Sequence, residues 1–280
     1  MPLRRTTGRS TRLIRAVLTA ALAAVFLLPL VLMVTGSLEA PGTPPSRAGR
    51  LVPESPSVQG YREAFELVDL GRYLGNSLLV VAVAVPLSVL CASWAGFVIA
   101  SARRRARIAL VALAAVAFAV PSTALVVGRF TLFKGLGLLD TYAPLVAPAL
   151  LGTSSLYVLL YAWSFHRLAP EHVELARLEG LGPLQLWRHV AMPLVRPVTV
   201  AVAVLSFSLT WGNFLDPLVY LSDERLFTVP LGLRSLSLVG HQDVPVFLAG
   251  AVVATAPVLV AFVCIQRHFF ETAAANGSRR

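Results

Sequence analysis

Six stretches of the chain are apolar over about twenty consecutive positions, instead of alternating with polar residues at helical or strand spacing. A helix of that length crosses a hydrocarbon core of about 30 Å. The predicted spans cover residues 13–34, 76–100, 108–130, 142–165, 193–211 and 246–265. The pattern therefore predicts an all-α integral membrane protein with six transmembrane helices.

The composition agrees with lipid as the main solvent. Of the 280 residues, 56% are hydrophobic and 14% are charged, whereas soluble domains carry roughly 45–50% apolar and about 25% charged residues. The composition therefore excludes an ordinary soluble domain.

The net charge of +10 is concentrated beside the apolar stretches. Arginines cluster before the first span and between the second and third: Arg4, Arg5, Arg9, Arg12 and Arg15, then Arg103, Arg104, Arg105 and Arg107. Such clusters are typical of cytoplasmic anchors, so membrane lipid and not nucleic acid is the expected partner. With the amino terminus inside, inner segments hold 16 of the 24 lysines and arginines, which predicts two cytoplasmic termini in a multi-pass plasma-membrane protein.

The first span has a basic segment before it, as a cleavable signal peptide would. The stretch from Ala16 to Val34 is longer than a usual signal-peptide core, and no convincing small-x-small cleavage site follows it. A retained helix is the favoured interpretation.

The predicted organisation has a basic cytoplasmic amino terminus at 1–12, a six-helix transmembrane domain at 13–270 and a cytoplasmic tail at 271–280. Within the domain, 36–75 forms an extracytoplasmic loop and 166–193 a cytoplasmic loop between the fourth and fifth helices.

Prolines and charges inside the spans are informative. Kinks are expected at Pro29, Pro86, Pro121, Pro148 and Pro257, because proline removes a backbone donor. Charged residues are nearly absent from the spans, which argues against a proton relay or an ion-coupled carrier. The exceptions are Arg129, Arg196 and Asp216, which lie near predicted helix ends, where snorkelling or interfacial anchoring is favoured.

The cytoplasmic loop contains signals for two short helices joined by glycine. Pro170 suits a first helical turn, Gly180 and Gly182 offer a stop, Pro183 starts a second helix, and Pro193 ends it. Such a knob would suit a groove on a partner protein. By periodicity alone, a generic capped loop is the favoured alternative.

A resemblance now adds to this interpretation. Glu174, Ala176 and Gly180, followed by Val190-Ala191-Met192-Pro193, resemble the EAA loop of ABC importer permeases, which reads Glu-Ala-Ala, three residues, glycine, nine residues and an Ile-x-Leu-Pro-like ending. Leu175 and Glu179 depart from the alanine and aspartate usual there, and the tail lacks the usual ending.

Other motifs resemble the carbohydrate-uptake branch, over about residues 10 to 270. They are Asn76-Ser77-Leu78, Trp211-Gly212-Asn213-Phe214 with Pro217 and Leu218, and Thr228-Val229-Pro230-Leu231-Gly232-Leu233. The resemblance implies a coupling helix seated in an ATP-binding subunit. Contact residues would be Glu174, Ala176, Arg177, Glu179, Gly180 and Pro193.

The resemblance assigns a role to several of these positions. Glu174 would make polar contacts with the ATP-binding subunit, Ala176 would permit its close approach, Gly180 would allow a turn where a side chain would clash, and Pro193 would start the fifth span. The implied partners are an ABC ATPase dimer, a second permease subunit in a heterodimer, and an extracytoplasmic solute-binding protein.

No catalytic machinery is recognisable. A P-loop needs Gly-Lys-Ser/Thr, but the single lysine, Lys134, is followed by Gly135, so ATP must be handled by another chain. The histidines form no H-E-x-x-H metal site, and Cys91 and Cys264 are assigned to packing, so no cofactor is expected. The alternatives are an integral membrane enzyme and an ATP-independent secondary carrier.

The cargo is expected to be a carbohydrate, and its contacts stay open. Trp211, Asn213, Tyr157 and Tyr161 suit a hydroxylated ligand by residue type, but packing and interfacial roles are favoured for them.

Overall fold

The computed structural model is helical, and the described residues contain no β-strand. The described residues are 9–44, 51–150, 155–168, 174–176, 178–239 and 243–277. They divide into two units, which are described separately: unit 1 comprises residues 1–70 and 233–256, and unit 2 comprises residues 71–232 and 257–280.

Unit 1 contains α1 (Arg9–Ser37), α2 (Gln59–Leu67) and parts of α13 (Val229–Val239) and α14 (Val244–Gly277). None of the most apolar stretch of α1 is buried in the chain itself. Because so much exposed apolar surface is unfavourable in water, α1 needs lipid or another subunit to cover it.

Two carboxylates organise the polar part of unit 1. Glu39 is 2% exposed, and its oxygens accept hydrogen bonds from the backbone N–H groups of Glu54 (2.9 Å) and Ser55 (3.2 Å). Asp243 accepts one from the Gly42 N–H at 2.7 Å. These bonds satisfy loop donors that would otherwise be costly to bury.

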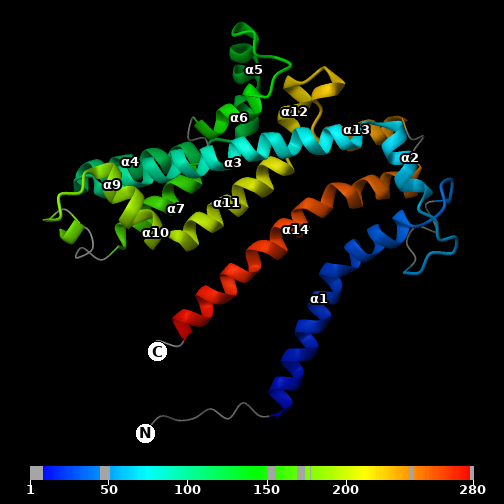
Figure 1. Cartoon of the computed structure of the whole chain (residues 1–280), viewed down its shortest axis with the longest axis horizontal. Coiled ribbons are helices and arrows are strands. Elements are labelled where there is room, and N and C mark those ends of the chain that lie inside the picture. The colour runs from blue at the N-terminus through cyan, green and yellow to red at the C-terminus, as the bar shows by residue number, and fades with distance from the viewer. Residues whose placement is uncertain are drawn as a thin grey trace. The chain divides into compact units, whose positions relative to one another are not determined.

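Unit 2 is built around α3 (Leu70–Ser101). The other elements that lie wholly in this unit are α4 (Arg104–Ala119), η1 (Ser122–Leu125), α5 (Val126–Gly135), α6 (Ala143–Leu150), α7 (Ser155–His166), α9 (Pro183–Leu186), η2 (Trp187–Ala191), α10 (Met192–Leu194), α11 (Arg196–Trp211), α12 (Leu215–Tyr220) and η3 (Glu224–Leu226). In Figure 1, α4, α7, α9 and α10 gather at one end of α3, while α5, α6 and α12 lie together at another part of it.

Four helical stretches are long and apolar enough to cross a membrane singly: Leu13–Ser37, Leu70–Ser101, Ala143–His166 and Val244–Cys264. Two more candidates are bent pairs, Arg104–Ala119 with Ser122–Gly135 (82°) and Pro183–Leu194 with Arg196–Trp211 (84°). The all-α membrane fold is thus confirmed, and the described helices supply four spans, or six if each bent pair is one span.

The third predicted span, 108–130, is not one straight helix. Its break falls at Pro121, and the preceding Val120 is extended (φ −74°, ψ 120°), as expected before a residue that disfavours the α conformation of its neighbour. By contrast, helices continue through Pro29, Pro86, Pro148 and Pro257.

A close helix contact in unit 2 brings α3 against α7 at Gly96. A methyl group there would lie 2.5 Å from Tyr161 Cβ and 2.8 Å from the Ala162 backbone nitrogen. Tyr161 is fully buried and stacks on Phe165, with ring centroids 5.6 Å apart. Small residues let membrane helices approach this closely.

We predict that Gly96→Ala lowers the free energy of unfolding by about 1–3 kcal/mol, because overpacking forces the two helices apart. The measurement is detergent-induced unfolding of the purified chain, followed by circular dichroism. Gly75→Ala is the matched control on the same helix, since a methyl group there meets nothing within 4 Å. Equal losses in both variants would refute the contact.

Candidate functional site

The first part of loop 166–193, which was predicted to be cytoplasmic, ends in a glycine turn. Residues 174–176 and 178 are helical, and Gly180 has φ +79°. The Leu181 N–H donates to the Ala176 carbonyl at 3.1 Å, which is the long-range bond of a Schellman cap. A methyl group at Gly180 would touch nothing within 4 Å, so the backbone angle, and not the predicted clash, is what requires glycine.

The described residues of this knob present both apolar and acidic side chains to the outside. Leu178 is 84% exposed and Leu175 is 60% exposed, with Glu174 and Glu179 also exposed. Ala176 is buried, so its small side chain faces the chain itself instead of offering the predicted surface for close approach. Arg177 lies outside the described residues, as do residues 169–173.

The second part of the loop packs on α3. The Gly182 N–H is capped by the Gln185 side chain at 3.0 Å, and Leu186 is buried. Trp187 meets Trp94 of α3 edge-on, with ring centroids 5.6 Å apart. Residues Trp187–Ala191 form a π turn, a feature often found at functional positions.

The resemblance predicted that Pro193 starts the fifth span, but the structure places it elsewhere. It lies inside α10, and α11 begins at Arg196 after an 84° bend that centres on Val195 (φ −100°, ψ 19°). Pro197 then occupies the first turn of α11, where its missing N–H costs nothing. The sharp turn between loop and span is therefore made just after Pro193.

A half-polar cavity of about 230 Å³ lies within unit 2. It is lined by residues from α3, α6, α7, α11 and α12 and from the turn after α11. Its polar lining consists of Ser88, Tyr157, Ser206, Thr210, Asn213 and Asp216. Hydroxyl, amide and phenol groups at this depth are expensive in lipid unless they meet partners.

The charge at the edge of this cavity is neutralised within the chain. Arg129 of α5 and Asp216 of α12 form an ion pair at 3.3 Å, with side chains 21% and 16% exposed. The Asn213 amide donates to the other Asp216 oxygen at 2.8 Å, and its own oxygen accepts the Asp216 N–H at 3.2 Å. Arg129 also lies 5.7 Å from the centre of the Tyr220 ring.

The expectation that Arg129 and Asp216 anchor separately at an interface is therefore replaced by direct pairing. The two residues are 87 positions apart, and no local pattern in the sequence brings α5 to α12.

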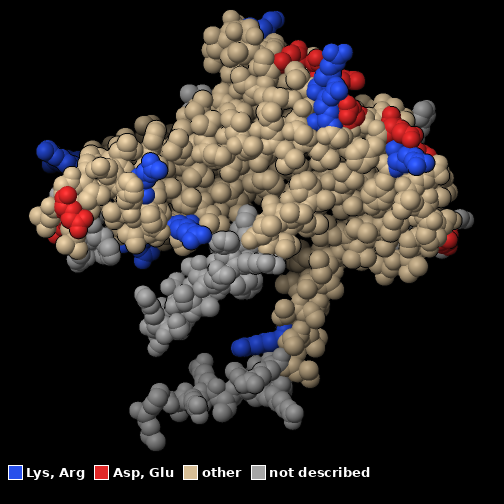
Figure 2. Space-filling view, in the orientation of Figure 1, with Lys and Arg blue, Asp and Glu red and all other residues tan. Residues whose placement is uncertain are grey.

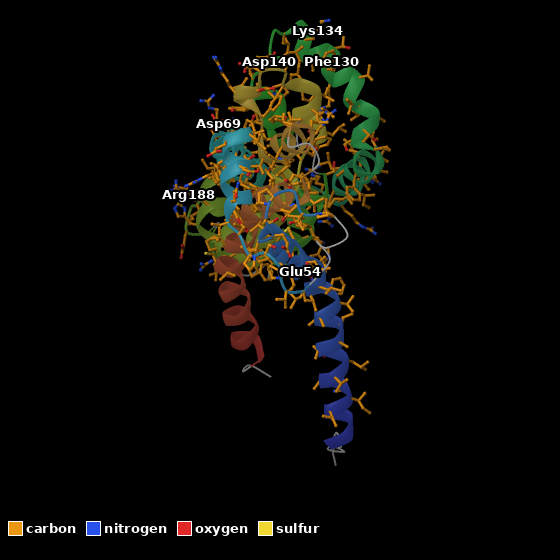
Figure 3. The ribbon with its side chains drawn as sticks, turned by 90° about the vertical axis from the view of Figure 1, so that its right-hand side faces the viewer. Glu54, Asp69, Phe130, Lys134, Asp140 and Arg188 are labelled. Carbon is orange, nitrogen blue, oxygen red and sulfur yellow. The ribbon has the colours of Figure 1, made fainter. Side chains whose placement is uncertain are left out.

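Hydrogen bonds to Asp140 hold the carboxyl-terminal end of α12 and the residues that follow it. The Asp140 N–H donates to the Tyr220 carbonyl at 3.0 Å, and the Asp140 carboxylate accepts the N–H groups of Ser222 and Asp223. These two donors lower the pKa of Asp140 below its usual value. Figure 3 shows Phe130, Lys134 and Asp140 at this end of unit 2, away from Arg188 of the loop.

Two of the four residues considered for sugar contact reach the cavity. Tyr157 and Asn213 line it. Tyr161 is fully buried, and Trp211 is 6% exposed and stacks on Phe207 at 5.8 Å. Within the part of the chain that the structure describes, no three His, Cys, Asp or Glu residues are grouped as a metal site.

The chain is similar to several membrane transport proteins. Arabinooligosaccharides transport system permease protein AraQ of Halalkalibacterium halodurans is 29% identical over 206 residues, 73% of each chain. Melibiose/raffinose/stachyose import permease protein MelC of Bacillus subtilis is 24% identical over 93% of this chain and 94% of its own. Trehalose transport system permease protein SugB of Mycobacterium tuberculosis is 27% identical over 90% and 92%.

The fold is also shared with a solved structure. A chain from the crystal structure of a bacterial ABC transporter involved in the import of the acidic polysaccharide alginate superposes with a TM-score of 0.75 at 19% identity, over 96% of this chain and 100% of that one. Residues 84–271 match the family described as binding-protein-dependent transport system inner membrane component. This match includes the whole cytoplasmic loop and the cavity, and the chain belongs to that family of multi-pass membrane permeases.

Proposed function

We propose that this chain is a translocating subunit of an ATP-driven importer and that its cargo is a carbohydrate delivered by a solute-binding protein. The observation that carries the proposal is the family match over residues 84–271, which contains the Gly180 turn at the expected place. The names of the relatives support the cargo class, since they refer to arabinooligosaccharides, raffinose-type sugars and trehalose.

The proposed arrangement places both termini, the segment before residue 13 and the tail from 271 in the cytoplasm, with residues 13–270 as the permease domain of a bacterial plasma-membrane protein. The excess of arginines on those sides supports it. The exposed apolar face of α1 is consistent with contact to a second permease subunit.

The coupling site would be the exposed face of residues 174–180. We assign contact with an ATPase subunit to Glu174, Glu179 and the two exposed leucines, Leu175 and Leu178, while Arg177 stays a candidate from the sequence. Gly180 and the bend after Pro193 would set the angle at which ATPase closure pulls on α11.

The cavity would form one wall of the translocation path. Its volume of about 230 Å³ is below the roughly 300–1,000 Å³ usual for small-molecule sites, so a second subunit would complete it. Hydroxyl and amide groups suit a hydroxylated solute. Because Asp216 is already paired with Arg129, the wall offers no free cation to an acidic sugar, which favours an uncharged cargo.

The coupling assignment predicts that alanine substitutions at Gly180 and Gly182 have different effects on ATPase recovery. Gly180→Ala forces a non-glycine residue to φ +79° at a cost of roughly 1–2 kcal/mol, so recovery of a P-loop ATPase with the affinity-purified chain should fall about tenfold. Gly182 has φ −70°, which alanine adopts without strain, so Gly182→Ala should retain the ATPase. The measurement is quantitative mass spectrometry of the mild-detergent eluate, and equal recovery would count against the turn.

A substitution at Leu178 tests contact with the ATPase subunit separately from folding of the chain. Since its side chain is 84% exposed in the chain alone, Leu178→Gln should leave thermal stability unchanged while reducing ATPase recovery and sugar uptake several-fold. If uptake and recovery match wild type, Leu178 is not in the interface.

The ion pair predicts non-additive effects. Arg129→Gln or Asp216→Asn alone leaves one charge unpaired at a partly buried site and should cost about 1–3 kcal/mol of stability and most of the uptake. The double variant restores neutrality and should recover part of both. Detergent unfolding and uptake of a labelled neutral oligosaccharide are measured in a double-mutant cycle, and strictly additive losses would contradict the pairing.

A further inference from the structure

A second cavity lies outside the proposed path, between the carboxyl-terminal end of α3 and the second half of the cytoplasmic loop. This groove has a volume of about 800 Å³ and is mainly apolar. Trp94, Phe97 and Val98 form one side, and Leu184, Leu186 and Trp187 form the other. None of these residues lines the polar cavity.

The apolar walls are open to the outside of the chain. Val98 and Leu184 are each 63% exposed, and Trp94 is 45% exposed. Side chains of this kind at the end of a membrane-spanning helix need an apolar occupant. Trp187 lines the groove, and its buried Nε1 has no hydrogen-bond partner among the described residues.

The groove lies where membrane meets water. Three of the four tryptophans of the chain, Trp94, Trp163 and Trp187, belong to this end of unit 2, and Trp163 is 60% exposed beneath the Arg167 guanidinium at 4.5 Å. Tryptophan and arginine together are typical of the interfacial level of membrane helices.

Uncompensated positive charge adjoins the groove. Ser101 and Ala102 line its end, and the next residues, Arg103, Arg104 and Arg105, are exposed. Among described residues none of these three arginines forms an ion pair, whereas Arg107 contacts His166 Nδ1 at 3.3 Å. Figure 2 shows several basic side chains, and an acidic group, at this end of unit 2. Glu174 and Glu179 are exposed acidic residues of the loop.

We propose that the groove binds one acyl chain of an anionic phospholipid whose phosphate is held by Arg103, Arg104 and Arg105. The apolar walls accept the chain, and the guanidinium groups bind phosphate oxygens as planar forks. An uncharged protein segment would fill the groove without pairing the three arginines. Residues 184–187 belong to the same loop as the proposed coupling site at 174–180, so the bound lipid would hold that loop against α3.

The test uses the full chain in lipid nanodiscs, in a Trp163→Phe/Trp211→Phe background that leaves Trp94 and Trp187 as the fluorescent groups. Nanodiscs contain a small, equal fraction of acyl-brominated phosphatidylglycerol or acyl-brominated phosphatidylcholine in unlabelled phosphatidylcholine. Brominated phosphatidylglycerol should quench the fluorescence at a several-fold lower fraction. Replacing the three arginines by glutamine should remove that several-fold preference.

Controls separate the site from general effects of charge and fold. Lys134→Gln/Arg225→Gln removes two exposed basic groups elsewhere in unit 2 and should leave the preference intact. Leu184→Gln introduces a polar group into the apolar wall without adding a fluorescent side chain, and it should weaken quenching. Equal quenching by both brominated lipids would show bulk lipid contact only, and no quenching by either would show a groove covered by protein; each result overturns the proposal.

Discussion

The close approach of α3 to α7 at Gly96 is the contact on which unit 2 depends. α3 supplies one wall of the polar cavity through Ser88 and one wall of the apolar groove through Trp94, while α7 supplies Tyr157 and leads into the cytoplasmic loop. With no side chain at Gly96, the two backbones come together and the fully buried Tyr161 fills the space beside them. Cavity and loop are therefore attached to the same pair of helices.

Electrostatics in this unit are kept local. Inside the helical region, Arg129 and Asp216 cancel each other and use Asn213 to complete the set of hydrogen bonds. At the α9 end, Arg103, Arg104 and Arg105 are exposed and form no ion pair among the described residues. This division follows from the cost of charge in lipid, because a charge that cannot reach water must find its partner within the protein.

Hydropathy alone predicted most of the fold, since apolar runs of membrane length leave few alternatives, and the charged residues beside them predicted the positions of the loops. Kinks were expected at several prolines of the spans, but only Pro121 marks a sharp break among them, while Pro29 and Pro86 lie in continuous helices. The bend at Val195 had no signal in the sequence. The strength of a proline break depends on tertiary support for the backbone groups it frees.

The candidate site was predictable to the extent that it is local in sequence. Gly180 could be identified from the loop motif, and its φ of +79° explains why glycine is needed there. The burial of Ala176, the exposure of Leu178 and the pairing of Arg129 with Asp216 depend on helix rotation and on contacts between distant segments, which no spacing rule contains. Of the residues considered for sugar contact, Tyr157 and Asn213 differ from Tyr161 and Trp211 only in the direction they face.

The central claim is that this permease moves a sugar with energy taken from ATP by another chain. The most direct measurement is uptake of a labelled oligosaccharide into proteoliposomes that contain the complex purified through this chain, with its solute-binding protein supplied on one side and ATP on the other. The account predicts accumulation that requires both ATP and the binding protein and that persists when ion gradients are dissipated. Uptake that proceeds without ATP and stops with the ion gradient would contradict it and favour a secondary carrier.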